Sequence, residues 1–382
     1  MNPRTRTETP PEKPAVAPAT ALQDLWRQPM AQLTRSVTVA ALLMAATGCE
    51  PEPRSVLGDS DQTVDRLQPV LVTEKVPHDS DDPAIWINPD DPSKSLVLGT
   101  DKGGDDGDGG LYVFNLDGTI DRDRSVTGLA RPNNVDVAYG LALGGGPVDY
   151  AVVTERLTNK IRLYALPDMT PIDGGGIPVF EGEDQRAPMG VAVYADPADG
   201  EHYVVVGRKD GPTDGSYLWQ YRLFDAGNGT VGGEVVRRFG AFSGEKEIEA
   251  IAVDSELGYI YYSDEQVGVR KYFAHPDSSS RELLLFAVGE VRDDHEGISV
   301  YRNADGTGVI VLSDQQARRF NVYRRTGDNA FLGAKDLAVR ESDGNDITST
   351  PLGPDFPQGL FVAMSDDRTF HFYRAEDLIG TF

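Results

Sequence analysis

The sequence predicts an all-β protein, a six-bladed β-propeller, from three observations. After about residue 68, apolar residues alternate with polar ones in short runs, and helical periodicity is lacking. Gly, Asp, Asn and Pro separate the runs, as turn residues do. The runs recur six times in one order at about 50 residues per copy, a period typical of propeller blades.

The first element of each copy is a short strand that ends in a turn. The copies are "DDPAIWINPDDP", "PNNVDVAYG", "PMGVAVYADPADG", "EIEAIAVDSELG", "DHEGISVYRNADG" and a degenerate "DGNDITSTPLGPDFPQG". One anchor residue is taken from each copy, and anchors of successive copies lie 52, 56, 60, 47 and 49 residues apart. The anchors are Asp82, Asn134, Gly190, Ala250, Gly297 and Asp346. This spacing indicates one repeated supersecondary unit.

The second element is a strand that breaks at a polar pair and resumes with an aromatic residue, as in "GYIYYSDEQVGVRKYF" and "GVIVLSDQQARRFNVYRR". A β-sandwich is the competing fold, but it would not place the polar pair identically in six copies. We expect the segment "QPVLVTEKV" to supply the outermost strand of the last blade and so close the ring.

The N-terminal region predicts export. Residues 1–29 are Pro-rich and are expected to be a non-native or disordered extension, with a signal peptide at 30–48, a disordered linker at 49–67 and the propeller at 68–382. The apolar run at 37–46 is too short to span a bilayer. "ATGC" resembles a bacterial lipobox, so we expect lipidation of Cys49 and attachment to the cell envelope. A plain signal peptide with an incidental cysteine, and hence secretion, is the alternative.

The composition excludes several classes of function. Acidic residues number 61 against 36 basic ones, and the net charge of -25 leaves no basic excess for binding nucleic acid. The single cysteine excludes an intrachain disulfide and a CxxC motif. An acidic surface is typical of cation binding, or of a protein that stays dispersed by self-repulsion, and we expect a monomer.

Blade geometry brings certain polar residues to one mouth of the central channel. The start of each first strand and the end of each antiparallel second strand meet there. The first-strand starts carry Asp81, Asp82, Asn133, Asn134, Met189, Glu249, Asp294, Glu296, Asp343 and Asp346. The second-strand ends carry Asp101, Lys102, Glu155, Arg156, Arg208, Lys209, Asp264, Glu265, Asp314, Gln315, Ser365 and Asp366.

Basic groups of blades one to three thus face carboxylates of blades four to six and of blade one. Carboxylate-rich sites suit a hard cation such as calcium, and Lys and Arg opposite them suit an anion such as phosphate. The alternative is a set of solvated loop charges whose ion pairs contribute little. Recurrence at equivalent blade positions favours a site.

With these residues placed, the chain resembles the β-propeller phytases, calcium-dependent phosphatases secreted by bacteria. "DDPAIWINP", "GTDK", "NNVD", "GRKDG", "IEAIAVDSELG", "SDE", "DHEGISVY" and "PLGPDFPQGLFVA" follow in the family's order. The resemblance covers residues 75–373. It implies a 3-phytase that hydrolyses calcium phytate, myo-inositol hexakisphosphate, by direct attack of water at a site with several Ca²⁺ ions.

The resemblance also implies roles for individual residues. The phosphate ligands would be Lys102, Arg156 and Lys209, with Asp210 beside them. Glu249, Glu265 and Glu296 would hold catalytic calcium, with Asp81 and Asp343 contributing. Structural calcium would be held by Asp82 with the Pro83 carbonyl, and by Asp294 with Gln315.

The sequence departs from the family at Met189, where a tyrosine is common, and in the shortened acidic loops "ESDGND" and "MSDDRTFHFY". Two other functions stay open. A calcium propeller lactonase or phosphotriesterase would also hold calcium in the channel but would not need three basic groups on one wall. A non-catalytic exported propeller would bind calcium or a phosphorylated ligand without turnover.

Overall fold

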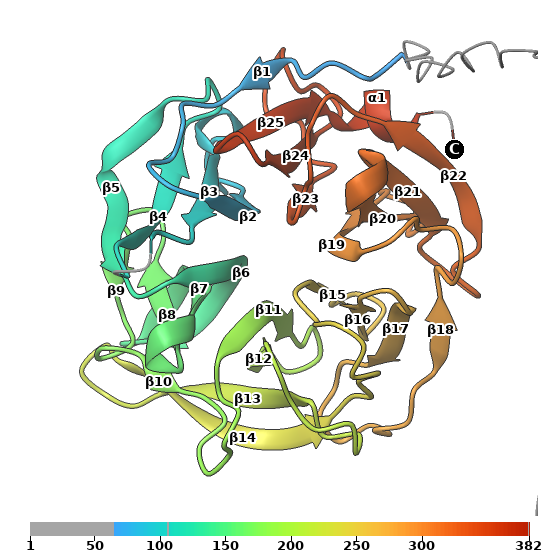
Figure 1. Cartoon of the computed structure of the whole chain (residues 1–382). Helices are drawn as coiled ribbons and strands as arrows, with labels where there is room; N and C mark the ends of the chain where they lie inside the picture. Colours follow the sequence, from blue (N-terminus) through green and yellow to red (C-terminus); the bar gives the residue numbers. More distant parts are fainter. Residues whose placement is uncertain (1–64, 105–106, 381) are drawn as a thin grey trace, which may run out of the picture. The chain divides into compact units, whose positions relative to one another are not determined.

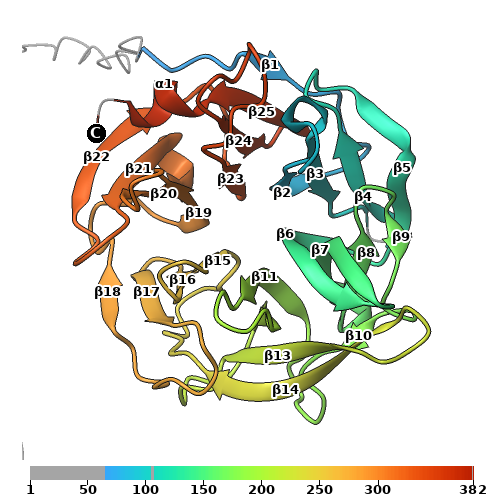
Figure 2. The same ribbon diagram turned by 180° about the vertical axis from the view of Figure 1, so that it is seen from behind.

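The computed structural model describes residues 65–104, 107–380 and 382. Six antiparallel sheets stand around a central channel, which confirms the predicted six-bladed propeller (Figures 1 and 2). The expected signal peptide and Cys49 lie outside the described residues. None of the helices in the described ranges is long and apolar enough to cross a membrane.

Each of the first five blades is built in chain order from the channel outward, apart from the small strands of blade two. Blade one comprises β2 (Ser80–Trp86), β3 (Leu96–Asp101), β4 (Gly109–Phe114) and β5 (Ile120–Leu129). Blade two comprises β6 (Pro132–Leu143), β7 (Gly146–Glu155), β8 (Lys160–Ala165), β9 (Thr170–Pro171) and β10 (Ile177–Pro178). Blade three comprises β11 (Pro188–Ala195), β12 (His202–Arg208), β13 (Leu218–Asp225) and β14 (Val231–Phe239).

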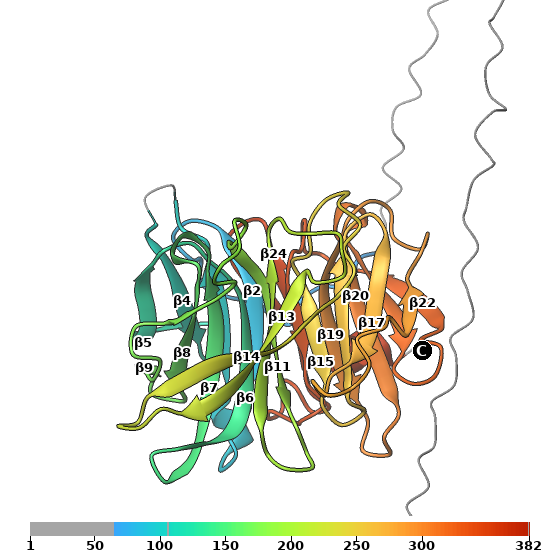
Figure 3. The same cartoon turned by 90° about the horizontal axis from the view of Figure 1, so that it is seen from below.

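Blade four comprises β15 (Ile251–Asp254), β16 (Tyr259–Asp264), β17 (Gly268–Phe273) and β18 (Leu284–Phe286). Blade five comprises β19 (His295–Arg302), β20 (Gly308–Asp314), β21 (Arg319–Arg324) and β22 (Phe331–Asp336). Blade six comprises β23 (Asn345–Ile347), β24 (Leu360–Ser365), β25 (Thr369–Arg374) and β1 (Leu71–Val72). Short helical turns are η1 (Pro92–Lys94), η2 (Arg156–Thr158), η3 (Gln315–Ala317) and α1 (Ala375–Ile379). Seen edge-on, the strands run between the two faces of the ring (Figure 3).

The ring is closed by the N-terminal segment, as the sequence predicts. Strand β1 pairs antiparallel with β25, in the register Leu71 with Phe372 and Val72 with His371. Hydrogen bonds from the Val70 and Thr73 amides to β25 extend this pairing. Leu67, in the expected linker, already forms a bridge to Leu337, so propeller contacts begin before residue 68. Closure satisfies the outer edge of β25, which would otherwise be unpaired.

Removal of β1 should weaken the whole ring. A chain that begins at Pro77 lacks β1 and its backbone hydrogen bonds to β25. We expect its Tm to fall by on the order of 10 °C, since several kcal/mol of pairing and burial are lost. Thermal unfolding followed by circular dichroism measures this, with a chain that begins at Asp65 as the control. Equal Tm values for the two chains would show that β1 does not secure closure.

The core lies between neighbouring blades. Ile85, Val97 and Phe114 of blade one pack against Phe370 and Phe372 of blade six in one continuous cluster. Gly99 permits this approach, because a Cβ atom there would lie 2.3 Å from Cε2 of Phe370. Because blades one and six bury apolar side chains against each other, the channel mouth they share has a firm support.

The innermost strands of four blades each begin with a β-bulge. The strand register shifts between Ser80 and Pro83, Pro132 and Val135, Pro188 and Val191, and His295 and Ile298. A bulge leaves residues out of the ladder and re-aims their side chains. The same four bulges therefore lie at the channel mouth and leave residues 81–82, 133–134, 189–190 and 296–297 out of the regular ladder.

Candidate active site at the channel mouth

Two groups of three carboxylates lie among the described residues at this mouth, and each is close enough to hold one ion. In the first triad, comprising Asp81, Glu249 and Asp343, one ligand oxygen per residue lies within 4.8 Å of the others. The second triad, comprising Glu265, Asp294 and Glu296, meets the same limit. All six were expected as calcium ligands, but the structure alone shows how they divide.

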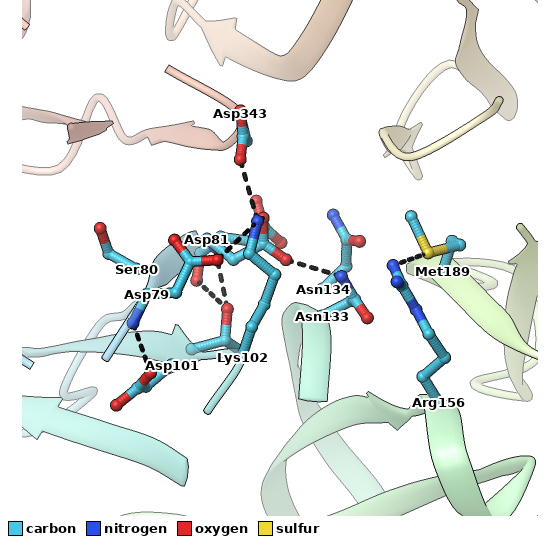
Figure 4. Close-up of polar contacts among 12 residues, drawn as sticks. Asp79, Ser80, Asp81, Asp101, Lys102, Asn133, Asn134, Arg156, Met189 and Asp343 are labelled. Atoms are coloured by element: carbon cyan, nitrogen blue, oxygen red, sulfur yellow. Dashed lines mark hydrogen bonds and ion pairs between the residues drawn. The ribbon is translucent and has the colours of Figure 1, made fainter. Parts of the chain in front are cut away.

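Lys102, which directly follows β3, neutralises the first triad. Its Nζ lies 3.1 Å from Oδ1 of Asp81, 3.2 Å from Oδ2 of Asp343 and 3.4 Å from Oδ2 of Asp79 (Figure 4). Asn133 Nδ2 donates a hydrogen bond of 2.9 Å to the other Asp81 oxygen. The ammonium thus joins blades one and six across the mouth.

Burial and mutual repulsion disfavour ionisation within the first triad. Burial, together with the charges of Asp81 and Asp343, raises the pKa of Glu249 well above its ordinary value. Burial raises the pKa of Asp343 to about 7, although Lys102 acts in the opposite direction. Burial by itself would lower the pKa of Lys102, but Asp81, Asp343 and Asp79 together raise it, so Lys102 is a permanent cation.

The second triad is more deeply buried. Glu265 follows β16 and is 1% exposed, and Glu296, in the bulge of β19, is 3% exposed. Burial raises the pKa of Glu265 to about 7 and that of Glu296 well above its ordinary value. Burial also opposes ionisation of Asp294, but hydrogen bonds from Lys246 and two glutamine side chains outweigh it and lower the pKa.

Both triads fit a hard divalent cation. Each offers carboxylate oxygens without sulfur or imidazole, the donor set that Ca²⁺ prefers. Oε2 of Glu296 is buried and has no hydrogen-bond partner among the described residues. A buried carboxylate oxygen left without a donor is costly, so a cation is the natural partner for it.

The two other expected phosphate ligands are Arg156, which follows β7, and Lys209, which follows β12. Together with Lys102 they form what is called here the basic wall, on blades one to three. The Arg156 guanidinium points at the sulfur of Met189, which is fully buried (Figure 4). Burial lowers the pKa of Arg156 from its ordinary value. Lys209 Nζ lies 2.7 Å from Oε2 of Glu247, while Asp210 is exposed beside it. Met189 thus contacts the basic wall directly.

Asp82 and Pro83 belong to neither triad. They line a cavity of about 130 Å³ in the channel, together with Asp136 and Asp346. Oδ2 of Asp82 accepts a hydrogen bond of 3.0 Å from the Val135 amide of the next blade, and burial raises the pKa of Asp82 well above its ordinary value. Asp82 therefore links blades one and two below the mouth.

Asp294 and Gln315, the expected ligands of a structural calcium, each form hydrogen bonds with other side chains. The Gln315 side chain donates to Asp343 of the first triad, and it is Gln316 Nε2 that donates to Asp294, at 2.6 Å. Gln316 also donates to the side-chain oxygen of Gln315. The two glutamines thus connect the triads to each other.

Two further residues of the candidate site come from the segment before β15. Lys246 Nζ lies 2.6 Å from Glu265 Oε2 and 2.7 Å from Asp294 Oδ2, and Glu247 contacts Lys209. Neither residue was predicted as part of the site, although the charged run "EKE" at 245–247 leads into the first strand of the fourth copy. The charged run was the available signal, but loop residues carry no periodicity that shows where they point.

Comparison with known proteins agrees with this geometry. A family model described as Phytase matches residues 33–372. The 3-phytase of Bacillus subtilis (strain 168) is 30% identical over 307 residues, which are 75% of this chain and 75% of that protein. Because the family model matches most of the chain, the chain belongs to the phytase family.

Proposed function

We propose that the protein is a calcium-dependent 3-phytase, a phosphomonoesterase that releases phosphate from phytate by direct attack of water. The observation that carries this proposal is the pair of carboxylate triads opposite a basic wall at one mouth of the channel. Membership of the phytase family and the similarity to a 3-phytase support the same substrate. Export through residues 30–48 and lipidation of Cys49 are further parts of this proposal.

The residues that would hold the metal are those of the two triads. Calcium bound there would supply positive charge to the phosphate oxygens and a coordinated water of lowered pKa. The carboxylates would fix the position of that charge. Burial raises the pKa values of Glu249 and Glu296, so their ionisation is unfavourable, and a bound cation would offset that cost.

The basic wall would bind and orient the phosphate. Lys102, Arg156 and Lys209 present one ammonium, one guanidinium and a second ammonium, which suit the equatorial oxygens of a transferring phosphoryl group. Lys102 belongs both to this wall and to the first triad, so it would align the phosphate with the metal. Direct attack by water requires no nucleophilic side chain. The His295 Nε2 atom contacts the Ala287 carbonyl, so we assign this side chain a structural role within its blade and not a role in binding substrate.

Calcium dependence of phosphate release tests the proposal. The purified protein is incubated with phytate at pH 7–8, with millimolar calcium or with excess chelator. We expect release with calcium and a loss of at least a hundredfold with chelator, because the triads then lack their cations. Chelator-resistant release would refute the calcium mechanism. No release with calcium, from a protein whose Tm still rises with calcium, would indicate a non-catalytic propeller.

A further inference from the structure

Lys246 occupies the place in the second triad that a metal ion would need. Its ammonium lies 2.6 Å from Glu265 and 2.7 Å from Asp294. Calcium binds carboxylate oxygens at about 2.3–2.6 Å. An ion bound to these two carboxylates would therefore overlap the ammonium, and the two cations exclude each other.

The ammonium satisfies the triad only in part. Its contacts are with Glu265 and Asp294, and the buried Oε2 of Glu296 is left without a hydrogen-bond partner in the part of the chain that the structure describes. When all three carboxylates are ionised, the single positive charge of the ammonium neutralises only part of their negative charge. A divalent ion that contacts all three would neutralise more charge at shorter distances.

The Lys246 side chain can leave while its backbone stays in place. Ser243, three residues before it, is held by Asp264 through bonds of 3.0 Å to the amide and 2.6 Å to the hydroxyl. The Glu247 carbonyl accepts a bond from the Glu265 amide, and its side chain binds Lys209. Between these two anchors the Lys246 side chain is 37% exposed, so a path to solvent is open.

We propose that Lys246 is a built-in cation that holds the second triad in the metal-free protein and competes with the divalent ion for it. Metal binding at this triad is then an exchange, in which the ammonium moves to solvent as the ion enters. Because the ammonium is attached to the backbone beside the triad, its local concentration there is high. This competition lowers the apparent affinity of the triad for the metal. This inference rests on the proposed function for the identity of the ion.

The Lys246→Met variant tests the competition. It keeps an unbranched side chain, one atom shorter, but removes the charge. We therefore expect calcium to bind the purified protein about tenfold more tightly, as measured by calorimetric titration with calcium alone. Lys246→Arg keeps the charge and should retain the weaker binding. Lys94→Met is the matched control, because Lys94 is exposed and its ion pair in the described part of the chain is with Asp91. Unchanged or weaker calcium binding by Lys246→Met would overturn the proposal.

A double variant assigns the effect to the second triad. Adding Glu296→Gln to Lys246→Met removes one carboxylate, and we expect the gain in calcium affinity to disappear. A gain that persists in the double variant would place the competition elsewhere and contradict the inference.

Amine labelling of the unmodified sequence gives a test independent of folding of the variants. The protein is briefly acetylated in chelator or in millimolar calcium, and modification of Lys246 and Lys94 is quantified by mass spectrometry. We expect Lys246 modification, relative to Lys94, to rise at least threefold with calcium, because the ammonium is released. An unchanged or lower ratio would refute the exchange. Neither readout uses phytate, so the exchange can hold even if phytase activity is not found.

Discussion

The Lys102→Met variant is expected to hydrolyse phytate with kcat/KM lowered by about 10²–10³-fold in saturating calcium. The ammonium lies within 3.4 Å of three carboxylates from two blades, at the point where the basic wall meets the first triad. Its loss removes a charge that would stabilise the phosphoryl group, and it leaves Asp81 and Asp343 to repel both each other and the substrate. Steady-state phosphate release measures the effect.

Lys94→Met is again the matched control and should retain full activity. A Lys102→Met protein that keeps more than half of its kcat/KM would contradict a role for the ammonium in catalysis. The same variant separates the competing functions. Hydrolysis of a lactone or a phosphotriester that survives the change, with no phytate hydrolysis in either protein, would favour the lactonase or phosphotriesterase.

Without metal, the protein is expected to lose stability as the pH rises from 6.5 to 8. Burial raises the pKa values of Glu265, Asp343 and Asp346 to about 7, far above those of carboxyls in an unfolded chain. In this window the folded protein binds protons that the unfolded chain has already lost. The free energy of unfolding therefore falls with rising pH. We expect Tm to fall by on the order of 5 °C in chelator.

Calcium should reverse this dependence, since it favours the ionised carboxylates. Thermal unfolding at pH 6.5, 7.2 and 8.0, in chelator and in calcium, tests both statements. The window begins at 6.5 because three buried histidines, His202, His295 and His371, have lowered pKa values. These histidines cost stability only at lower pH, where they would be protonated in the unfolded chain. A chelated protein whose Tm rises toward pH 8 would contradict the assignment of the raised pKa values.

The blade order and the content of the channel mouth could be predicted because both rest on local signals. Alternation of apolar residues with a period of two specifies strands, and six copies of one unit specify the ring. Antiparallel pairing then fixes which strand ends share a face, so Lys102, Arg156 and Lys209 fall on one wall without further information. The closing strand could also be foreseen, since β25 would otherwise present an open edge.

Only the tertiary structure decided how those residues are partnered. Lys102 and Asp343 are 241 residues apart and meet only because blade six closes against blade one. In the β2 bulge, Asp81 turns to the mouth while Asp82 turns to the channel, a division that strand periodicity does not predict. Lys246 enters the second triad from a loop, where side-chain direction depends on the contacts of Ser243 and Glu247. Strands and repeats are encoded in neighbouring residues, whereas a cluster of like charges forms only where ring closure and loop anchoring force the residues together.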